Sequence, residues 1–439
     1  MESRLDSVRG RVLEGLDVAR RAGADGARIV FQHHEASNCD FEAGRLKTAS
    51  ASEALGVSID VLVNGRTGAT AGNRLDDLGR LITDAVALAR AAGRRAYFTA
   101  WPAPQALASV PLHSARTAAL TRDELLAPCQ EFVAALRAVD TELRIDAGAG
   151  RHESEWLLAT TGGVCYAKSR SGWHLGGHVQ RTRGTDILSA GDGRGWGEVN
   201  AWFDIRPVIE RVIEDLRHAE RTVEPPMGKV LVFLPPETLQ AFLWPLSLGI
   251  NGRTVAKGES PLAGRLGQRV LAPCFTIIDD PHVPYGGGSE IDTDGIPTRR
   301  HVLADRGVLQ RFLYDLDSAG LAKAEPTGNN GCSPYHVMVQ PGQRSSRDLL
   351  RSIRDGLVVK ALIGFGQSNI LNGDFSANVG LGFRVRDGEV VGRVKDTMIA
   401  GNLYELLNLD DCELSSDTNF NGAIPYAVVP GVTVKSRTS

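Results

Sequence analysis

Ten histidines in 439 residues make metal-dependent hydrolysis the first chemistry to look for. A zinc peptidase helix carries two histidines about one turn apart, with a glutamate beside the first, so that the ligands and the general base share a face. His34 precedes Glu35, and His152 precedes Glu153, but neither pair is followed by a second histidine at helical spacing. These two dipeptides therefore do not predict a zinc site.

His174 and His178 are the closest pair of histidines with the spacing of one helical turn, and Gly176 and Gly177 lie between them. Two adjacent glycines disfavour a helix. On a strand the two side chains would share a face but lie about 13 Å apart, which is too far for one metal ion. We expect a glycine-rich strand that carries two surface histidines.

Nucleophiles for acyl transfer are also weakly supported. Ser260 is followed by Pro261, at a position where the nucleophile elbow of serine hydrolases needs a backbone N–H. Cys332 lies four residues before His336, but a catalytic Cys and His are normally brought together by the fold rather than by adjacency. We therefore expect Cys332 to be an ordinary loop thiol.

Five carboxylates gather within one short segment, as they do in oxygen-ligand sites for Ca²⁺ or Mg²⁺. The commoner explanation of such a cluster is a solvated acidic loop between two strands, and this is what we expect here. The residues are Asp279, Asp280, Glu290, Asp292 and Asp294.

Composition excludes several classes of function. Forty-nine basic residues against 52 acidic ones give a net charge of −3, which argues against binding to nucleic acid. The six cysteines are dispersed without a CxxC pair, which argues against a structural zinc site or a disulfide scaffold. The amphipathic start is unlike a signal peptide, and no apolar stretch could span a membrane, so we expect a cytoplasmic protein. The 49 glycines exceed the usual share of about 7%, and we assign them to turns between strands.

The elements that must position any site predict an α+β fold with two domains. Residues 1–224 form an N-terminal α/β layer with antiparallel strands. Its core unit, 1–100, has the order helix, strands, helix, and 115–224 has the order helix, strand meander, helix. Asn64-Gly65 is typical of a tight hairpin, and the glycine-rich stretch 186–197 predicts a mobile loop. Two prolines at 225–226 mark the boundary.

Residues 225–439 predict a strand-rich C-terminal domain with a mostly antiparallel sheet. Asp-Arg-Gly at 305–307 and Arg-Asp-Gly at 386–388 are compact hairpin connections, with Gly where φ must be positive. The apolar stretch 237–248 predicts a helix that Pro245 kinks. A final helix is expected over 397–407.

An ordered series of short motifs resembles the TldD/PmbA family, whose members were once called modulators of DNA gyrase. The N-terminal motifs are GRL at 44–46 and NGRTG at 64–68. The C-terminal motifs are GRLGQRV at 264–270, TIIDDP at 276–281, DGIPTR at 294–299, LYDLDSA at 313–319, PTGN at 326–329, NGDFS at 372–376 and IAGNL at 399–403. Together they span nearly the whole chain.

This resemblance implies one subunit of a two-component metallopeptidase. In the family, the TldD-like subunit carries the zinc motif, and the PmbA/TldE-like subunit lacks it and helps to enclose a chamber for peptides. The corresponding segment here is FLWPLSLG at 242–249, which has neither His nor Glu, and Cys412 lies outside a Cys-Gly-Lys arrangement. The resemblance therefore implies a PmbA/TldE-like chain with no catalytic residue, no metal ligand and no cofactor of its own.

The expected partner is a TldD-like subunit that holds zinc in a hetero-oligomer, with self-association as another form of assembly. The expected substrate is a peptide or a small amide, with neither nucleic acid nor membrane as a partner. Polar residues within the C-terminal motifs are the candidates for substrate binding in the chamber: Asn369, Asp374, Ser376 and Asn402. The alternative role for each of them is a turn or a helix cap, where Asn, Asp and Ser are common.

Two other classes of function stay open at this point. One is a diverged, self-sufficient hydrolase that cleaves amides in a natural-product pathway such as antibiotic biosynthesis. The other is a regulatory module that binds a protein partner.

Overall fold

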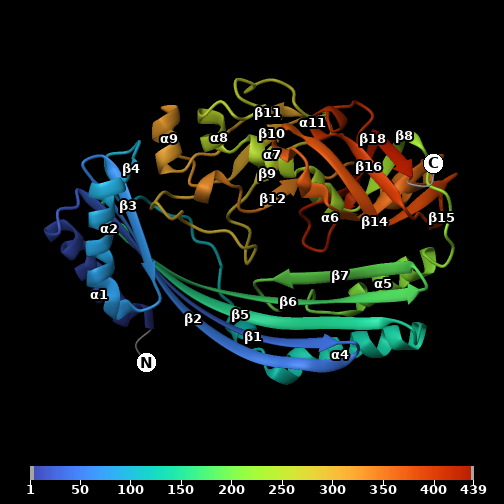
Figure 1. Cartoon of the computed structure of the whole chain (residues 1–439), viewed down its shortest axis with the longest axis horizontal. Coiled ribbons are helices and arrows are strands. Elements are labelled where there is room, and N and C mark those ends of the chain that lie inside the picture. The colour runs from blue at the N-terminus through green and yellow to red at the C-terminus, as the bar shows by residue number, and fades with distance from the viewer. Residues whose placement is uncertain (1–3, 437–439) are drawn as a thin grey trace.

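A seven-stranded sheet built from the N-terminal half of the chain forms one layer of the molecule (Figure 1). The computed structural model describes residues 4–436. The strand order is β4-β3-β2-β1-β5-β6-β7, and every neighbouring pair is antiparallel. The strands are β1 (Gly26–Glu42), β2 (Arg45–Val63), β3 (Arg66–Gly72), β4 (Arg94–Arg95), β5 (Arg144–Thr160), β6 (Cys165–Arg183) and β7 (Asp186–Trp196).

Helices cover one face of this sheet at both ends. At one end, α1 (Arg4–Arg21) and α2 (Leu78–Ala92) pack on the apolar side chains of β1 and β2. At the other end, α3 (Ala115–Ala118), α4 (Arg122–Val139) and α5 (Arg206–His218) lie against β5, β6 and β7. Thr121 and Glu124 form the capping box that starts α4, as the sequence predicts.

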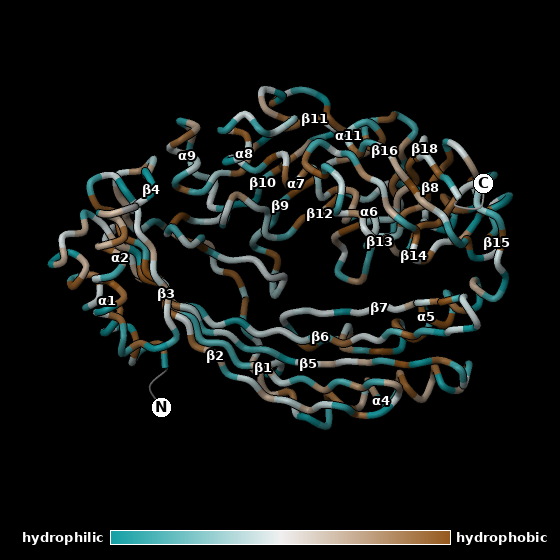
Figure 2. Tube along the Cα trace, in the orientation of Figure 1, coloured by the Kyte–Doolittle hydropathy of each residue, from teal (hydrophilic) through white to brown (hydrophobic). Residues whose placement is uncertain are grey.

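The period of two along β6 separates its side chains into two sets. Trp173, Leu175 and Val179 are buried in the cluster under α4 and α5. Lys168, Arg170 and His174 therefore point from the opposite face, which we call the inner face. In Figure 1 the inner face is turned toward the C-terminal half of the chain, and Figure 2 shows mostly neutral or hydrophilic colours along β6 and β7.

The same alternation places seven strand glycines on the inner face: Gly148, Gly150, Gly172, Gly176, Gly191, Gly193 and Gly195. Our assignment of the glycine excess to turns is thus wrong for this part of the chain. The predicted mobile loop at 186–197 is also wrong, because residues 186–196 form β7. The adjacent strand β6 pairs with β7 along its whole length, so the glycines need no side chains to hold the strand in place.

The C-terminal half contains two more sheets. One has the order β13-β8-β18-β16-β14-β15, with β17 beside β18, and the other has the order β11-β10-β9-β12. Only the β8–β13 pairing among them is parallel. The strands are β8 (Gly228–Leu234), β9 (Ile277–Asp279), β10 (His301–Asp305), β11 (Val308–Leu309), β12 (Val337–Val339), β13 (Asp355–Ile363), β14 (Asp374–Arg386), β15 (Glu389–Arg393), β16 (Thr397–Asn402), β17 (Glu413–Thr418) and β18 (Pro425–Ser436).

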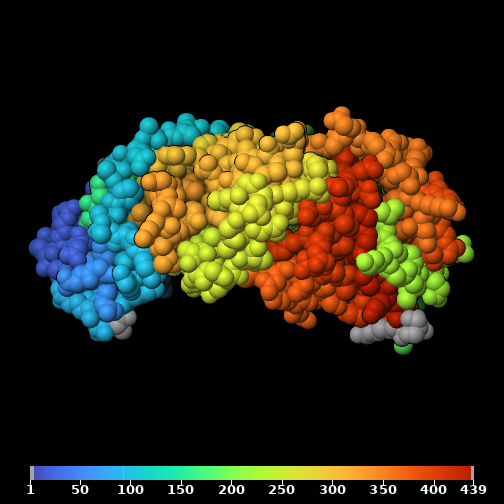
Figure 3. Space-filling model, turned by 90° about the horizontal axis from the view of Figure 1, so that it is seen from above, coloured from blue at the N-terminus to red at the C-terminus, as the bar shows by residue number. Residues whose placement is uncertain are grey.

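Short helices connect these strands. They are α6 (Pro236–Phe242), α7 (Trp244–Gly249), α8 (Gly252–Ala256), α9 (Leu316–Ala322), α10 (Ser346–Arg351) and α11 (Leu403–Leu406), with 3-10 turns η1 (Leu75–Asp77), η2 (Asn330–Cys332), η3 (Phe365–Gln367) and η4 (Ile370–Asn372). The predicted α+β class with antiparallel sheets is confirmed. Seen from above in Figure 3, the N-terminal helices form one end and the C-terminal half extends from them along the long axis.

Local signals predict the turns well and the last helix poorly. Gly307 and Gly388 have positive φ, 78° and 81°, in the two predicted hairpins. The kink expected at Pro245 is present as a break at Leu243, between α6 and α7. The helix expected over 397–407 is wrong, because 397–402 form β16 between β14 and β18 and only the short α11 follows. No described helix combines the length and the hydropathy of a membrane-spanning segment.

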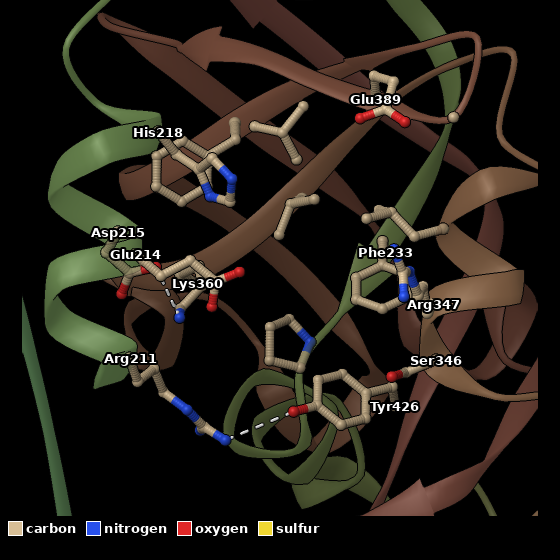
Figure 4. Close-up of a pocket in the computed structure, with 16 residues that line it drawn as sticks. Arg211, Glu214, Asp215, His218, Phe233, Ser346, Arg347, Lys360, Glu389 and Tyr426 are labelled. Carbon is tan, nitrogen blue, oxygen red and sulfur yellow. Dashed lines mark hydrogen bonds and ion pairs between the residues drawn. The ribbon is translucent and has the colours of Figure 1, made fainter. Parts of the chain in front are cut away.

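The two halves of the chain meet around a cavity of about 580 Å³ between α5 and the C-terminal sheet (Figure 4). Lys360 on β13 contacts Asp215 on α5, with 2.8 Å between Nζ and Oδ1. Arg211 Nη2 donates to the Tyr426 hydroxyl at 3.4 Å and its Nη1 lies 3.0 Å from Glu237. These contacts of Asp215 and Arg211 join α5 to the C-terminal half of the chain.

Replacing Gly68 by Ala is expected to destabilise the fold by about 1–3 kcal/mol, because there is no free volume for the added methyl group. A Cβ at Gly68 on β3 would lie 2.2 Å from the carbonyl oxygen of Ala85, in the backbone of α2. Urea denaturation measures the change in the free energy of unfolding. Gly56→Ala on β2 is the matched control, since its Cβ would have no neighbour within 4 Å. Equal stability of the two variants would contradict the tight packing of α2 on β3.

Replacing Lys360 by Met is expected to cost about 3–5 kcal/mol at pH 8, because it leaves the buried Asp215 carboxylate unpaired. Burial already raises the pKa of Asp215 and Lys360 lowers it, so the substitution raises it further. A carboxyl whose pKa is raised by folding stabilises the folded state at low pH. This stabilisation is lost as the pH rises through the folded-state pKa. The deficit should therefore be smaller at pH 5 than at pH 8 in urea titrations. Lys47→Met, which breaks an exposed pair with Glu42, should cost under about 1 kcal/mol.

Candidate functional site

The segment 242–249, at the place that the resemblance assigns to a zinc helix, is built around the core. Phe242 and Leu246 are buried, and the Phe242 ring stacks on Phe365 with 5.6 Å between centroids. Trp244 is the exposed member, with 43% of its surface accessible. The segment has no imidazole, carboxylate or thiol side chain. Its residues therefore do not fit a zinc ion, which needs nitrogen, sulfur or oxygen donors.

Two of the predicted substrate-binding residues lie together beside α7. Asn402 Nδ2 donates to Asp374 Oδ1 at 2.9 Å, across the β14–β16 pair. The Asn402 side-chain oxygen also accepts from the backbone N–H of Tyr404 at 3.1 Å, which caps α11. Tyr404 in turn donates its hydroxyl to the Pro245 carbonyl at 2.7 Å. Hydrogen bonds therefore connect these motif residues to the start of α7.

The other two predicted residues flank the turn that leads into β14. The Asn369 carbonyl accepts from the backbone N–H of Asp374 at 3.2 Å, and the Ser376 backbone N–H donates to Ser368 Oγ at 3.2 Å. The side chains of Asn369, Asp374 and Ser376 are exposed, whereas Asn402 is half-buried as a cap. Turn and cap roles are thus present, and substrate binding by the four residues stays a prediction.

The two cysteines singled out in the sequence, Cys332 and Cys412, are buried. Cys412 is buried, its thiol contacts the Leu406 carbonyl at 3.3 Å, and burial raises its pKa to about 12. Cys332 is buried 3.1 Å from Ser318 Oγ, and burial raises its pKa as well. Both thiols stay protonated near neutral pH, and the thiolate is the reactive form.

The two histidines of β6 lie as predicted. His174 and His178 are exposed on the inner face of a strand. A strand places residues four apart at about 13 Å, so the pair offers no common metal position.

The expected solvated acidic loop is wrong, because Asp279 and Asp292 are buried and bind backbone N–H groups, while Asp280, Glu290 and Asp294 are half-buried. Asp279 accepts hydrogen bonds from the backbone N–H groups of Tyr335 at 2.7 Å and His336 at 2.9 Å. Asp292 accepts from the N–H groups of Asp294 and Ile296, and burial raises its pKa to about 7. Backbone N–H groups thus replace water around these side chains.

A cluster that the sequence did not reveal forms on the helix-covered face of the sheet. His33 Nε2 lies 2.6 Å from Glu53 and 3.7 Å from Glu35, while its Nδ1 lies 3.5 Å from Glu155. His33, Glu35 and Glu53 are the one group within residues 4–436 in which three ligand-type side chains approach closely enough to hold a metal ion. The Arg4 guanidinium of α1 contacts all four side chains. The carboxylates therefore have a cationic partner that ties α1 to the sheet.

Two domain models of one protein family match separate parts of the chain. The PmbA/TldA metallopeptidase C-terminal domain matches residues 227–436, and the PmbA/TldA metallopeptidase domain 1 matches residues 27–89. Among curated proteins, one named "Metalloprotease" from Methanothermobacter thermautotrophicus is 30% identical over 228 residues, 50% of this chain and 50% of its own length. A "Metalloprotease TldD homolog" from Haemophilus influenzae is 28% identical over 36% of this chain and 35% of its own. The chain spans about half the length of the first of these relatives.

Solved structures extend the likeness of fold to the whole chain. TldE from Thermococcus kodakarensis superposes with a TM-score of 0.88 at 21% identity, covering 97% of this chain and 100% of that one. A protein described as a modulator of DNA gyrase from Bacteroides thetaiotaomicron gives a TM-score of 0.87 at 20% identity, covering 98% and 99%. At this identity the likeness establishes a shared fold. Two domain models of the PmbA/TldD family match the chain in order and together cover more than half of it, so the chain belongs to this family.

Proposed function

We propose that this chain is the TldE-like subunit of a two-component metallopeptidase, and that it encloses a chamber together with a zinc-bearing, TldD-like subunit that cleaves peptide or amide bonds. The observation that carries the proposal is the segment 242–249. By the resemblance it corresponds to the zinc helix of the TldD-like subunit, and its side chains are, apart from Ser247, apolar and mostly buried. Nothing in that segment could lower the pKa of a bound water, so the hydrolytic metal belongs on the partner.

The inner face of the N-terminal sheet supports a role in holding peptides. Gly191 and Gly193 on the edge strand β7 are exposed. An edge strand has unpaired backbone groups on one side, which an extended peptide can use as an additional strand. Glycines leave the adjoining surface free of bulky side chains. This subunit therefore shapes and binds the substrate while its partner supplies the reaction.

An exposed apolar surface near α7 supports docking of the zinc-bearing subunit. Trp244 is 43% exposed and Ile363 is 62% exposed, and a Cβ at Gly366 would lie 3.1 Å from the Trp244 ring. Exposed aromatic side chains of this kind are common at the centres of protein interfaces. A subunit docked there would lie next to Asn369, Asp374 and Ser376, the polar candidates for the chamber wall.

Cleavage by the pair is expected to require both chains and a metal. The purified chain should not hydrolyse an unstructured casein-derived peptide, whereas co-purified chain and TldD-like subunit should, and 1,10-phenanthroline should reduce the rate to background. Mass spectrometry of the products measures cleavage. Hydrolysis by the chain alone at a rate unaffected by the chelator would refute the proposal. One tightly bound zinc per isolated chain would refute it as well.

Replacing Trp244 by Asp is expected to weaken binding to the TldD-like subunit by about tenfold or more, as loss of a buried aromatic anchor does. Calorimetric titration of one subunit into the other measures the affinity, and thermal unfolding checks that the variant is folded. Leu13→Asp on α1 is the matched control, because Leu13 is similarly exposed, at 40%, and lies far along the chain from α7. Unchanged affinity of the Trp244 variant would place the interface elsewhere.

A further inference from the structure

Lys168 and Arg170 line a cavity of about 400 Å³ between the inner face of the N-terminal sheet and loops of the C-terminal half. They are two residues apart on β6 and so point to the same side. The sheet contributes Gln32, His34, Ser154 and Trp156 to the wall, and the loops contribute Gly287, Ser289, Ile291, Thr293, Asn330 and Tyr335. The cavity is thus built by both halves of the fold.

Neither cation has an acidic partner. Lys168 Nζ lies 2.5 Å from Ser289 Oγ and 4.5 Å from the centre of the Trp156 ring. Arg170 donates from Nη2 to the Gly288 carbonyl, and its buried Nε has no hydrogen-bond partner among the described residues. Within residues 4–436 neither side chain forms an ion pair. Two half-buried like charges side by side, with only neutral partners, are unfavourable unless something else supplies negative charge.

A half-buried guanidinium elsewhere in the same sheet is paired with carboxylates. Arg28 on β1 lies 2.7 Å from Asp60 and 2.5 Å from Asp294. The pKa values show the same contrast: burial lowers that of Lys168 to about 7 and lowers that of Arg170, whereas neighbouring carboxylates raise that of Arg28. Arg28 therefore has carboxylate partners, whereas Lys168 and Arg170 have none within residues 4–436.

The one acidic side chain that lines the cavity is already engaged elsewhere. Glu155 lies 3.5 Å from His33 Nδ1 and 3.7 Å from Arg4 Nη1, on the helix-covered side of the sheet. Apart from the two cations, the remaining titratable residues of the wall are His33, which is the partner of Glu155, His34 and Tyr335. A bound anion would thus find Lys168 and Arg170 without competition from a protein carboxylate.

We propose that Lys168 and Arg170 bind the carboxylate of a peptide substrate, either its C-terminal carboxylate or that of an acidic side chain. Lysine and arginine form strong charge-assisted hydrogen bonds with carboxylates, and Trp156 provides an apolar surface beside them. That the carboxylate belongs to a peptide rests on the function proposed above. The unpaired charges themselves do not depend on it.

Calorimetric titration of the full chain with three probes at pH 7 tests the proposal. The probes are Ala-Ala-Ala with a free C-terminus, its C-terminal amide, and N-acetyl-Ala-Glu-Ala-amide. We expect one or both carboxylate peptides to bind about tenfold or more tightly than Ala-Ala-Ala-amide, and which of them does so identifies the source of the carboxylate. Equal binding of all three would overturn the proposal. Inorganic phosphate that binds as tightly as the carboxylate peptides would overturn the assignment to carboxylates.

Two variants separate a ligand site from a structural role. Lys168→Met and Arg170→Gln should each weaken binding of the carboxylate peptide about tenfold or more, whereas Lys47→Met, an exposed lysine on β2, should not. Lys168→Met should also raise the thermal midpoint of the free chain, because it removes an unpaired buried charge. A lower midpoint together with unchanged peptide binding would show that Lys168 is structural. In the native chain, NMR should show the pKa of Lys168 rising when the peptide binds.

Activity of the assembled pair distinguishes failure of this inference from failure of the proposed function. If the pair cleaves peptide acids and amides equally well, and the chain binds neither preferentially, then Lys168 and Arg170 do not select carboxylates but the two-component function stands. If the chain selects the carboxylate peptide and no partner makes it part of a peptidase, then the anion site stands and the proposed function is wrong.

Discussion

The antiparallel register of β1, β5 and β6 is the constraint on which the rest of the molecule depends. Because side chains alternate along a strand, fixing Trp173 and Leu175 under the helices also fixes Lys168 and Arg170 on the opposite face. A shift of one residue would exchange the two sets. The helices α4 and α5 therefore orient the inner face without touching it. One register thus determines both the core and the side chains of the inner face.

Burial of charge follows a consistent pattern across the two halves. Asp215 meets Lys360 where α5 joins the C-terminal sheet, and Arg28 meets Asp294 where β1 meets the C-terminal loops. These two ion pairs connect the N-terminal half of the chain to the C-terminal half. Lys168 differs from these residues, because it is half-buried and forms no ion pair within residues 4–436, and burial lowers its pKa to about 7. Unpaired buried charge of this kind is characteristic of binding sites.

Local sequence signals predicted what is decided within a few residues. The Asn64-Gly65 turn, with φ of 49° and 72°, and the capping box at Thr121 depend on four or five neighbours, and both are present. The strand β7 was missed, because glycines weaken a strand unless adjacent strands supply its hydrogen bonds. The cavity around Lys168 was missed for a related reason. Its wall includes Ser289, more than a hundred residues away in the sequence, and nothing local shows that such a loop covers a strand.

The segment 242–249 joins these observations to the question of activity. A helix that held a metal would have to turn polar ligands toward a cavity, and here the corresponding side chains, such as Phe242 and Leu246, turn into the core. The side chains of this segment therefore pack in the core and stabilise the fold, and they provide no ligand for a metal ion. Polar side chains lie instead on the inner face of the N-terminal sheet and around Asn402. A packed α7 together with these polar groups fits the proposed role, in which this chain holds a substrate for a reaction that another chain performs.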